Sequence, residues 1–207
     1  MTAAANKKLT MKPMNLHDSV TDQDTLIREA CSDSSAFAQL YRLHYDTVFR
    51  YCARRLFNRH SAEDVTSIVF FKAMRTISSF RGNSRDFRNW LYRIAINAVN
   101  DHLRTAKRRA DAIRNIALVH ASDHTLDAES NCELQEEILP VKQALLTLNP
   151  KQQTVITLRF FEKLKLNEIA EILGQNPATT RSQLSRALSS LKRKLKAAAG
   201  QHGEVGR

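Results

Sequence analysis

The sequence predicts an all-α protein of two small helical domains joined by a flexible linker, the second domain being a helix-turn-helix. Glycine is scarce in the 207 residues, and only Gly82 and Gly174 occur before position 200. All-β sandwiches and barrels need a turn every ~8 to 12 residues, commonly made with Gly, Pro or Asn-Gly, so this chain has too few turn residues for them. Apolar side chains recur instead at steps of three and four, which is the period of an amphipathic helix.

The first predicted helices follow a polar segment. Residues 1–24 are polar and aperiodic, which favours a flexible tail. A helix is predicted over 33–56, where apolar side chains line one face: Phe37, Leu40, Tyr41, His44, Val48, Cys52 and Leu56. Ser61 and Asp64 resemble a capping box that opens a second helix over 61–78. This helix has more apolar residues than one buried stripe needs, so we expect a partner to cover part of it.

A loop and a third helix come next. The segment 80–86 (FRGNSRD) has the composition of a loop, in which Gly82 is free to take a positive φ. An amphipathic helix is predicted from Phe87 to about His102. The stretch that follows is acidic and lacks a sustained apolar period, which predicts a linker with some helix near 113–119.

Four helices are predicted in the last third of the chain, over 140–147, 150–161, 166–173 and 177–197. Pro140 and Pro150 stand where a first helical turn tolerates a missing N–H, and Asn149 is a suitable N-cap. Gly174 stands where the chain leaves the third of these helices in a left-handed conformation. Asn176 and Pro177 then open the fourth.

The formal net charge of +11 is unevenly distributed. Residues 1–109 have 19 basic and 10 acidic side chains (+9), residues 110–139 have one and seven (−6), and residues 140–207 have 12 and four (+8). This pattern favours two modules that face a polyanion and a segment between them that avoids it. The predicted organisation is a tail (1–24), a first domain (25–106), an acidic linker (107–137), a second domain (138–197) and a tail (198–207).

Several classes of protein are disfavoured. Cys31, Cys52 and Cys132 are odd in number and widely spaced, which argues against disulfides and a metal site. A mean hydropathy of −0.41, no apolar run near ~18 residues and no apolar core in residues 1–16 argue against membrane insertion and secretion, so a cytoplasmic protein is expected. No P-loop, dinucleotide fingerprint or nucleophile motif is visible, so we expect neither an enzyme nor a cofactor.

The C-terminal segment predicts a surface that reads duplex DNA. A short helix, a Gly-bearing turn and a longer helix form a helix-turn-helix, whose second helix enters the major groove. The inner face of that second helix is predicted to hold Thr180, Leu184, Ala187, Leu188, Leu191 and Leu195. Its outer face holds side chains that bond to base edges: Thr179, Arg181, Ser182, Gln183 and Arg186. Lys192, Arg193 and Lys194 lie further along, where phosphates are the expected contacts.

Aromatic and basic residues alternate in a second segment, over 80–104. They are Phe80, Arg81, Arg85, Phe87, Arg88, Trp90, Tyr92, Arg93 and Arg104. Aromatic faces stack on unpaired bases while guanidinium groups follow the backbone, so the mixture suits single-stranded DNA. Phe87 and Trp90 also have helical spacing, and the alternative is that they belong to the core.

Residues 37–105 and 138–196 resemble the two conserved parts of bacterial RNA polymerase sigma factors of the extracytoplasmic-function group. FRGNSRDFRNWLYRIAINAVNDHLR (80–104) is similar to the promoter-melting segment of that group, and AEDVTSIVFFKAM (62–74) is similar to its polymerase-binding helix. The segment 158–188 is similar to its reader of the upstream element. The chain departs from the usual pattern at Ser67 and Ile68, at Lys165 and Gln183, and in a loop one residue longer.

The resemblance implies partners and roles for particular residues. Core RNA polymerase, promoter DNA as duplex and as melted strand, and an anti-sigma factor are the implied partners. The implied contacts to the melted −10 element are Phe80, Arg81, Asn83, Ser84, Arg88, Trp90, Arg93, Asn97 and Asn100. The outer face Thr179, Arg181, Ser182, Gln183 and Arg186 then reads the −35 element. The implied polymerase contacts are Asp64, Val65, Ser67, Ile68 and Phe71.

One other class of function fits the same residues. A free-standing, dimeric helix-turn-helix regulator would read a palindrome and use the N-terminal half for dimerisation or sensing. Such a protein binds duplex DNA tightly without polymerase, whereas a sigma factor acts within a holoenzyme. A gel shift at stated salt separates them, because nonspecific phosphate contacts weaken steeply as salt rises.

Overall fold

The computed structural model describes residues 16–119 and 139–201, and every regular element within them is helical. The all-α prediction is confirmed for this part of the chain. The elements are α1 (Leu16–Glu29), α2 (Ser34–Leu56), α3 (Arg59–Thr76), the 3-10 turn η1 (Ile77–Ser79), α4 (Ser84–Val119), α5 (Leu139–Leu146), α6 (Pro150–Ile156), the π-helix η2 (Thr157–Phe161), α7 (Leu166–Leu173) and α8 (Pro177–Gln201).

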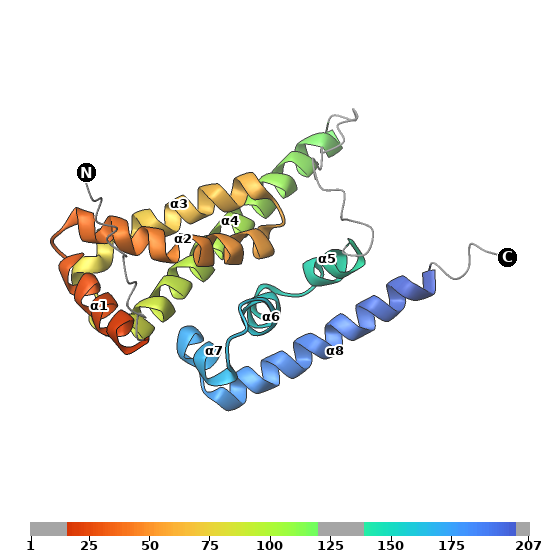
Figure 1. The fold of residues 1–207 in the computed structure, drawn as a ribbon. Helices are drawn as coiled ribbons and strands as arrows, with labels where there is room; N and C mark the ends of the chain where they lie inside the picture. Colours follow the sequence, from red (N-terminus) through yellow and green to blue (C-terminus); the bar gives the residue numbers. More distant parts are fainter. Residues whose placement is uncertain (1–15, 120–138, 202–207) are drawn as a thin grey trace, which may run out of the picture.

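Helices α1 to α4 form what we call the amino-terminal module. Figure 1 shows α2, α3 and α4 alongside one another, with α1 packed at one end of the group. Apolar faces of all four helices meet in one core, whose fully buried members include Tyr51, Val65 and Val99. Burial of such side chains is the main favourable contribution to folding, at about 25 cal/mol per Å².

Two helix starts differ from the predictions. Helix α3 begins at Arg59 because the Asn58 side chain accepts from the Ser61 amide at 2.8 Å, so the predicted Ser61–Asp64 capping box is wrong. Helix α4 begins at Ser84, three residues early. Its capping box is formed by Asn83 and Asp86, whose side chains each accept from the other's amide at 3.0 and 3.1 Å.

The predicted tails and linker are partly helical. Helix α1 covers 16–24, which polarity had assigned to the tail, and its last turns pack Ile27 into the core. Helix α4 runs on to Val119, so the first part of the predicted linker continues the helix. Residues 120–138, the rest of the linker, lie outside the described residues. Helix α8 likewise extends to Gln201, beyond the predicted end.

Helices α5 to α8 form what we call the carboxy-terminal module. Asn149 and Gln152 form a capping box that starts α6, as the N-cap prediction requires. The predicted helix over 150–161 ends in the five-residue π-helix η2. Leu145, Leu148, Ile156 and Ala187 make a small core between α5, α6 and α8.

The two modules pack directly on each other. Helix α7 contacts α4, and η2 contacts α2. Leu158, Leu164, Ile169 and Ile172 of the carboxy-terminal module belong to the same buried cluster as the amino-terminal core. The division of the chain into domains at particular residues remains a prediction.

Across the residues that the structure describes, each helix is too short or too polar to span a membrane.

Candidate nucleic-acid interface

The predicted duplex-reading face lies on the outside of α8, near its N-terminus. Thr179, Arg181, Ser182 and Arg186 are exposed, while Gln183 is half-buried. On the opposite side Thr180 and Ala187 are completely buried, as predicted. The prediction for Leu188 is wrong, since it is 39% exposed and lies at the edge of the packed face. The remaining polar stripe is free to approach a groove.

The turn before α8 sets the direction of this helix. Gly174 takes φ +61°, and its amide donates to the Glu171 carbonyl at 3.2 Å while the Gln175 amide donates to the Ala170 carbonyl at 2.9 Å. These two bonds are those of a Schellman motif, which satisfies carbonyls at a helix end. The Asn176 side chain then accepts from the Ala178 amide at 2.8 Å and opens α8.

The basic residues predicted to bind phosphate lie on the later part of α8. Lys192, Arg193 and Lys194 are all exposed. Each carries a full positive charge that no described carboxylate contacts within the ion-pair distance. Cations in this position suit the sequence-independent part of DNA binding, which depends on phosphate neutralisation.

The loop before α4 is held by carboxylates on both sides. Within the loop, Asn83 and Asp86 form the capping box described above. From α1, Asp24 Oδ1 accepts from the Ser84 amide at 2.6 Å, across 60 positions of sequence. Gly82 has φ +148°, and the Arg81 guanidinium donates to the carbonyls of Ser78 and Phe80. The loop therefore has a defined shape before any ligand binds.

Sequence reasoning missed Asp24. It lies in a segment assigned to a tail, and a single acidic residue 60 positions from the loop gives no local signal. Its bond to the loop depends on the packing of α1 against α4, a contact between segments far apart in the sequence.

The aromatic residues of the predicted strand-binding segment divide between core and surface. Phe87 is 1% exposed and belongs to the core, which is the alternative interpretation of its spacing. Phe80 and Trp90 are half-buried, and their ring centroids lie 5.2 Å apart. Together with Arg81, Asn89 and other residues they line a pocket, so they offer aromatic surface at its wall.

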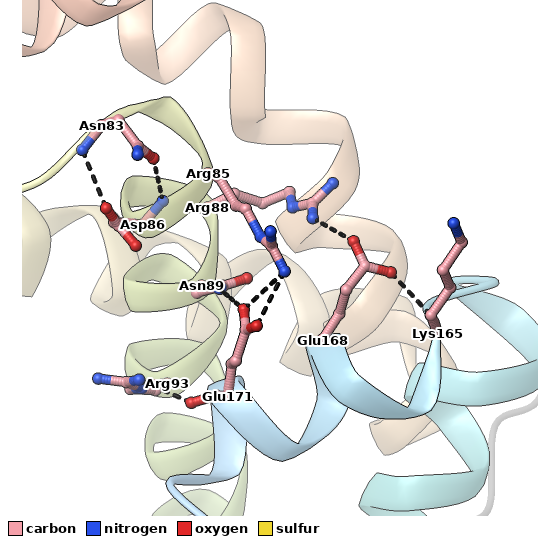
Figure 2. A network of polar contacts seen from close by, with 9 residues as sticks. All are labelled: Asn83, Arg85, Asp86, Arg88, Asn89, Arg93, Lys165, Glu168 and Glu171. Atoms are coloured by element: carbon pink, nitrogen blue, oxygen red, sulfur yellow. Dashed lines mark hydrogen bonds and ion pairs between the residues drawn. The ribbon is translucent and has the colours of Figure 1, made fainter. Parts of the chain in front are cut away.

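Three arginines in the first turns of α4 are engaged by the other module (Figure 2). Both carboxylate oxygens of Glu171 lie 2.9 Å from Arg85 Nη2, and Glu168 Oε1 lies 2.9 Å from Arg88 Nη2. Arg93 donates to the backbone carbonyls of Glu171 and Ile172 at 2.7 and 3.0 Å, at the C-terminus of α7. Arg88 and Arg93 were predicted to contact DNA, and in the structure of the free chain they contact α7.

The last two predicted strand contacts have different surroundings. Asn97 is exposed and lines a second pocket with Arg93, Ile172 and Gly174. Asn100 is half-buried and accepts from the buried Arg55 at 3.2 Å, which restricts its orientation. The structure thus places the predicted residues from Phe80 to Asn100 along one loop and one helix, in chain order.

Burial and hydrogen bonding fix the charge of two groups beside this face. Burial first, and the Arg88 charge second, lower the pKa of His44 to about 4, and its Nε2 accepts from the Gln23 amide nitrogen at 2.8 Å. His44 is therefore neutral at physiological pH. The Lys165 amide, and then Arg88, hold the pKa of Glu168 below its usual value, so Glu168 is ionised.

The predicted polymerase-binding helix has an exposed apolar stripe. Ile68, Phe71 and Met74 of α3 are 45%, 54% and 50% exposed. Asp64 and Ser67 are also exposed. Val65 was also predicted to contact polymerase directly. This prediction is wrong, because its side chain is fully buried in the core. Met74 takes its place on the surface and was missed, although it lies three positions from Phe71 and so shares its face.

No cluster of three or more His, Cys, Asp or Glu side chains able to hold a metal ion occurs among the described residues. Cys31 and Cys52 are free thiols.

Comparison with protein families gives two matches. The sigma-70 region 2 family matches residues 40–109, and the sigma-70 region 4 family matches residues 138–191. The first covers most of α2, all of α3, the loop before α4, and α4 as far as residue 109. The second covers α5 to α7 and α8 as far as residue 191.

Individual relatives are similar along most of the chain. The ECF RNA polymerase sigma factor BldN of Streptomyces coelicolor is 34% identical over 89% of this chain and 69% of its own length. The ECF RNA polymerase sigma factor SigW of Bacillus subtilis is 32% identical, over 79% and 91%. The RNA polymerase sigma-H factor of Pseudomonas aeruginosa is 34% identical, over 84% and 93%.

Two solved structures share the fold. CnrH, solved in complex with the cytosolic domain of CnrY, aligns with a TM-score of 0.59 at 22% identity over 84% of this chain and 97% of that chain. The sigma factor RpoE, solved in complex with the anti-sigma factor NepR from Bartonella quintana, aligns with a TM-score of 0.54 at 22% identity, over 77% and 96%.

Proposed function

The chain belongs to the extracytoplasmic-function group of RNA polymerase sigma factors, and on this premise we propose which of its surfaces do the work of initiation. As a sigma factor it binds core RNA polymerase and directs transcription to promoters by recognising the −35 and −10 elements and helping to melt the DNA. Both conserved regions are matched, in the expected order, so the alternative of a free-standing dimeric regulator is not retained.

The exposed polar stripe of α8 is the observation that carries the assignment of −35 reading. Arg181 and Arg186 project from the first turns of a helix whose other face is buried, and the Gly174 turn fixes that orientation. Arg bonds to guanine O6 and N7, and Gln bonds to adenine, so Arg181 and Gln183 are the side chains proposed to specify bases. Lys192, Arg193 and Lys194 then bind phosphate.

The loop over 80–86 and the start of α4 are proposed to hold the −10 element. The loop is already fixed by Asp24 and Asp86, which lowers the entropic cost of receiving an unpaired base. Phe80 and Trp90 supply aromatic surface, and Arg88 and Arg93 supply charge for the strand.

The exposed stripe of Ile68, Phe71 and Met74 is proposed to bind core polymerase. Three large apolar side chains about half exposed on one helix face form a patch that usually marks a protein interface. Bond formation belongs to the polymerase, and we assign no catalysis to this chain. We also expect the chain in the cytoplasm, where polymerase acts, and expect an anti-sigma factor as a further partner, as RpoE has in its complex with NepR.

Reconstitution tests this assignment. Purified core polymerase and the chain are incubated with genomic fragments, and the 5′ ends of the transcripts are sequenced to give the promoter elements. Transcripts that start at a shared pair of elements support the proposal. No association with core polymerase and no promoter-dependent transcript would contradict it.

Arg181→Ala gives the residue-level test within the same assay. We expect a loss of about 1 to 3 kcal/mol in binding and relaxed preference at one base pair of the −35 element. Ser189→Ala, an exposed substitution on another part of α8, is the control and should leave the preference unchanged. A uniform loss over all sequences would place Arg181 on a phosphate instead.

A further inference from the structure

The acidic face of α7 lies on Arg85 and Arg88 (Figure 2). The proposed function assigns Arg88 to the melted strand, and Arg85 lies in the 80–86 loop that is proposed to hold the −10 element. We propose that Glu168 and Glu171 take the place of DNA phosphates on this face, so that in the free chain α7 and single-stranded DNA compete for the same side chains. This inference rests on the proposed −10 assignment. It adds a regulatory contact within the chain itself.

The geometry of the contact is that of anion recognition. Glu171 presents both oxygens to Arg85 at 2.9 Å and also accepts from the Asn89 amide at 3.3 Å. Glu168 presents one oxygen to Arg88, and burial of the pair leaves Arg88 36% exposed. Charge-assisted bonds from guanidinium to a carboxylate and to a phosphate use the same donors in the same arrangement.

The distribution of acidic residues in the carboxy-terminal part supports the same inference. Residues 140–207 contain only four acidic side chains against 12 basic ones. Glu162, Glu168 and Glu171 are three of the four, and all three contact the amino-terminal module. Glu162 pairs with Arg54 at 2.8 Å and accepts from the Tyr92 hydroxyl at 3.2 Å. The negative charge of this basic module is therefore gathered on the face that meets α2 and α4.

The contact between the two modules also involves the backbone of the carboxy-terminal module. Arg93 donates to the Glu171 and Ile172 carbonyls near the end of α7, and the Glu171 carbonyl also accepts from the Gly174 amide. The Gly174 turn that aims α8 follows at once. Apolar contact through Ile169 and Ile172 accompanies the ion pairs, so charge selects this arrangement and burial adds to its stability.

The contact between α4 and α7 leaves two buried polar atoms without hydrogen bonds. Arg88 Nε and Asn89 Oδ1 are buried without a hydrogen-bond partner. Buried polar groups in this state cost free energy, so the contact is open to exchange for a ligand that satisfies them. A DNA strand binds only those molecules in which α7 has left α4. The apparent affinity of the chain for the strand is therefore the intrinsic affinity multiplied by the fraction of open molecules.

Fluorescence energy transfer can measure closure in the full-length chain. Dyes are attached to cysteines introduced as Gln39→Cys on α2 and Ser189→Cys on α8, both exposed positions. Cys31 and Cys132 are replaced by serine. Cys52 stays, because its thiol is buried and burial raises its pKa to about 11, which keeps it unreactive.

Glu171→Lys is the decisive variant, since it reverses the charge that faces Arg85. We expect a longer distance between the dyes and binding of an oligothymidylate of about 20 nucleotides that is tighter on the order of tenfold at about 50 mM salt. Glu29→Lys makes the same change of charge at an exposed site on α1 and should change neither quantity comparably. Glu168→Gln should give a smaller effect, because the amide oxygen still accepts from Lys165.

A charge-swapped pair provides the rescue. Arg85→Glu combined with Glu171→Lys restores opposite charges at this position and should restore the short distance. An unchanged distance in Glu171→Lys, or an equal gain in strand binding by Glu29→Lys, would overturn the proposal. A longer distance with no gain in strand binding would overturn the competition between α7 and the strand.

The unsubstituted labelled chain is also mixed with core polymerase. If the chain associates with core polymerase and the distance between the dyes increases, the modules open on assembly. If it associates and the distance between the dyes stays as short as in the free chain, opening on assembly is overturned. Failure to associate with core contradicts the proposed function instead, and the comparison of Glu171→Lys with Glu29→Lys still decides closure in the free chain.

Discussion

The two interior glycines of the chain occupy turns that look alike in sequence and differ in structure. Gly82 and Gly174 both have positive φ, at +148° and +61°. A Cβ added to Gly82 would lie 2.7 Å from Asp86 Cβ, whereas a Cβ added to Gly174 would meet nothing within 4 Å. The first turn thus needs glycine for space and for backbone conformation, and the second needs it for conformation alone.

The neighbourhoods of the turns explain this difference. The loop of Gly82 is shaped by its own capping box and by Asp24 from α1, so it is packed from two sides. The turn of Gly174 is closed by backbone bonds between successive residues of α7 and the turn itself. A loop that receives an unpaired base requires a fixed shape, and a turn that only sets the angle between two helices requires only a defined backbone path.

Gly82→Ala should have the largest effect of any substitution in or beside the two turns. The added methyl group meets a Cβ, which cannot rotate away, and the positive φ adds strain, so we expect a loss of about 2 to 3 kcal/mol in the loop conformation. Promoter melting should fall more than −35 binding. Permanganate reactivity of the −10 element in the holoenzyme measures the first, and footprinting of the −35 element measures the second.

Asp24→Ala should give the next largest effect. It removes the acceptor for the Ser84 amide at 2.6 Å, and a charged hydrogen bond of this kind contributes about 1.5 to 2 kcal/mol. The same permanganate assay should show slower melting with unchanged −35 binding. Asp24→Asn keeps an oxygen at this position and should retain most of the activity. Equal loss in both variants would mean that the charge, and not the bond, matters.

The contrast also shows what the sequence could and could not predict. The helices over 166–173 and from 177 onward follow from Gly174, Asn176 and Pro177, which act on neighbours in the chain. The bond from Asp24 to Ser84 depends on packing between distant helices, and so do the pairs of α7 with Arg85 and Arg88. Signals between neighbouring residues predicted the helices and the buried and exposed faces of α8. Contacts between residues far apart in the chain left no signal in the sequence.

The same argument applies to helix ends. Ser61 was predicted to open α3, whereas Asn58 is its N-cap, so α3 was predicted two residues late. Val65 has the spacing of the exposed stripe but faces the core, because the stripe of Ile68 and Phe71 begins one turn later.

Gly174→Ala should cost about 1 kcal/mol, the penalty of a left-handed conformation for an L residue with free space around its Cβ. Urea unfolding of the chain measures this loss. Specificity at the −35 element should stay unchanged, because the path of the turn is kept. Altered base preference in the transcription assay would show that the angle of α8 had moved.

Gly174→Asn should give the smallest effect, a loss of a few tenths of a kcal/mol, because Asn adopts the left-handed conformation more readily than other side-chain-bearing residues. The corresponding Gly82→Asn should be as damaging as Gly82→Ala, since its Cβ meets Asp86 in the same way. Asn therefore relieves the conformational cost at φ +61°, but at φ +148° it relieves neither the backbone strain nor the contact with Asp86. If Asn were tolerated equally at both positions in the urea and permanganate assays, crowding by Asp86 would not be the reason for Gly82.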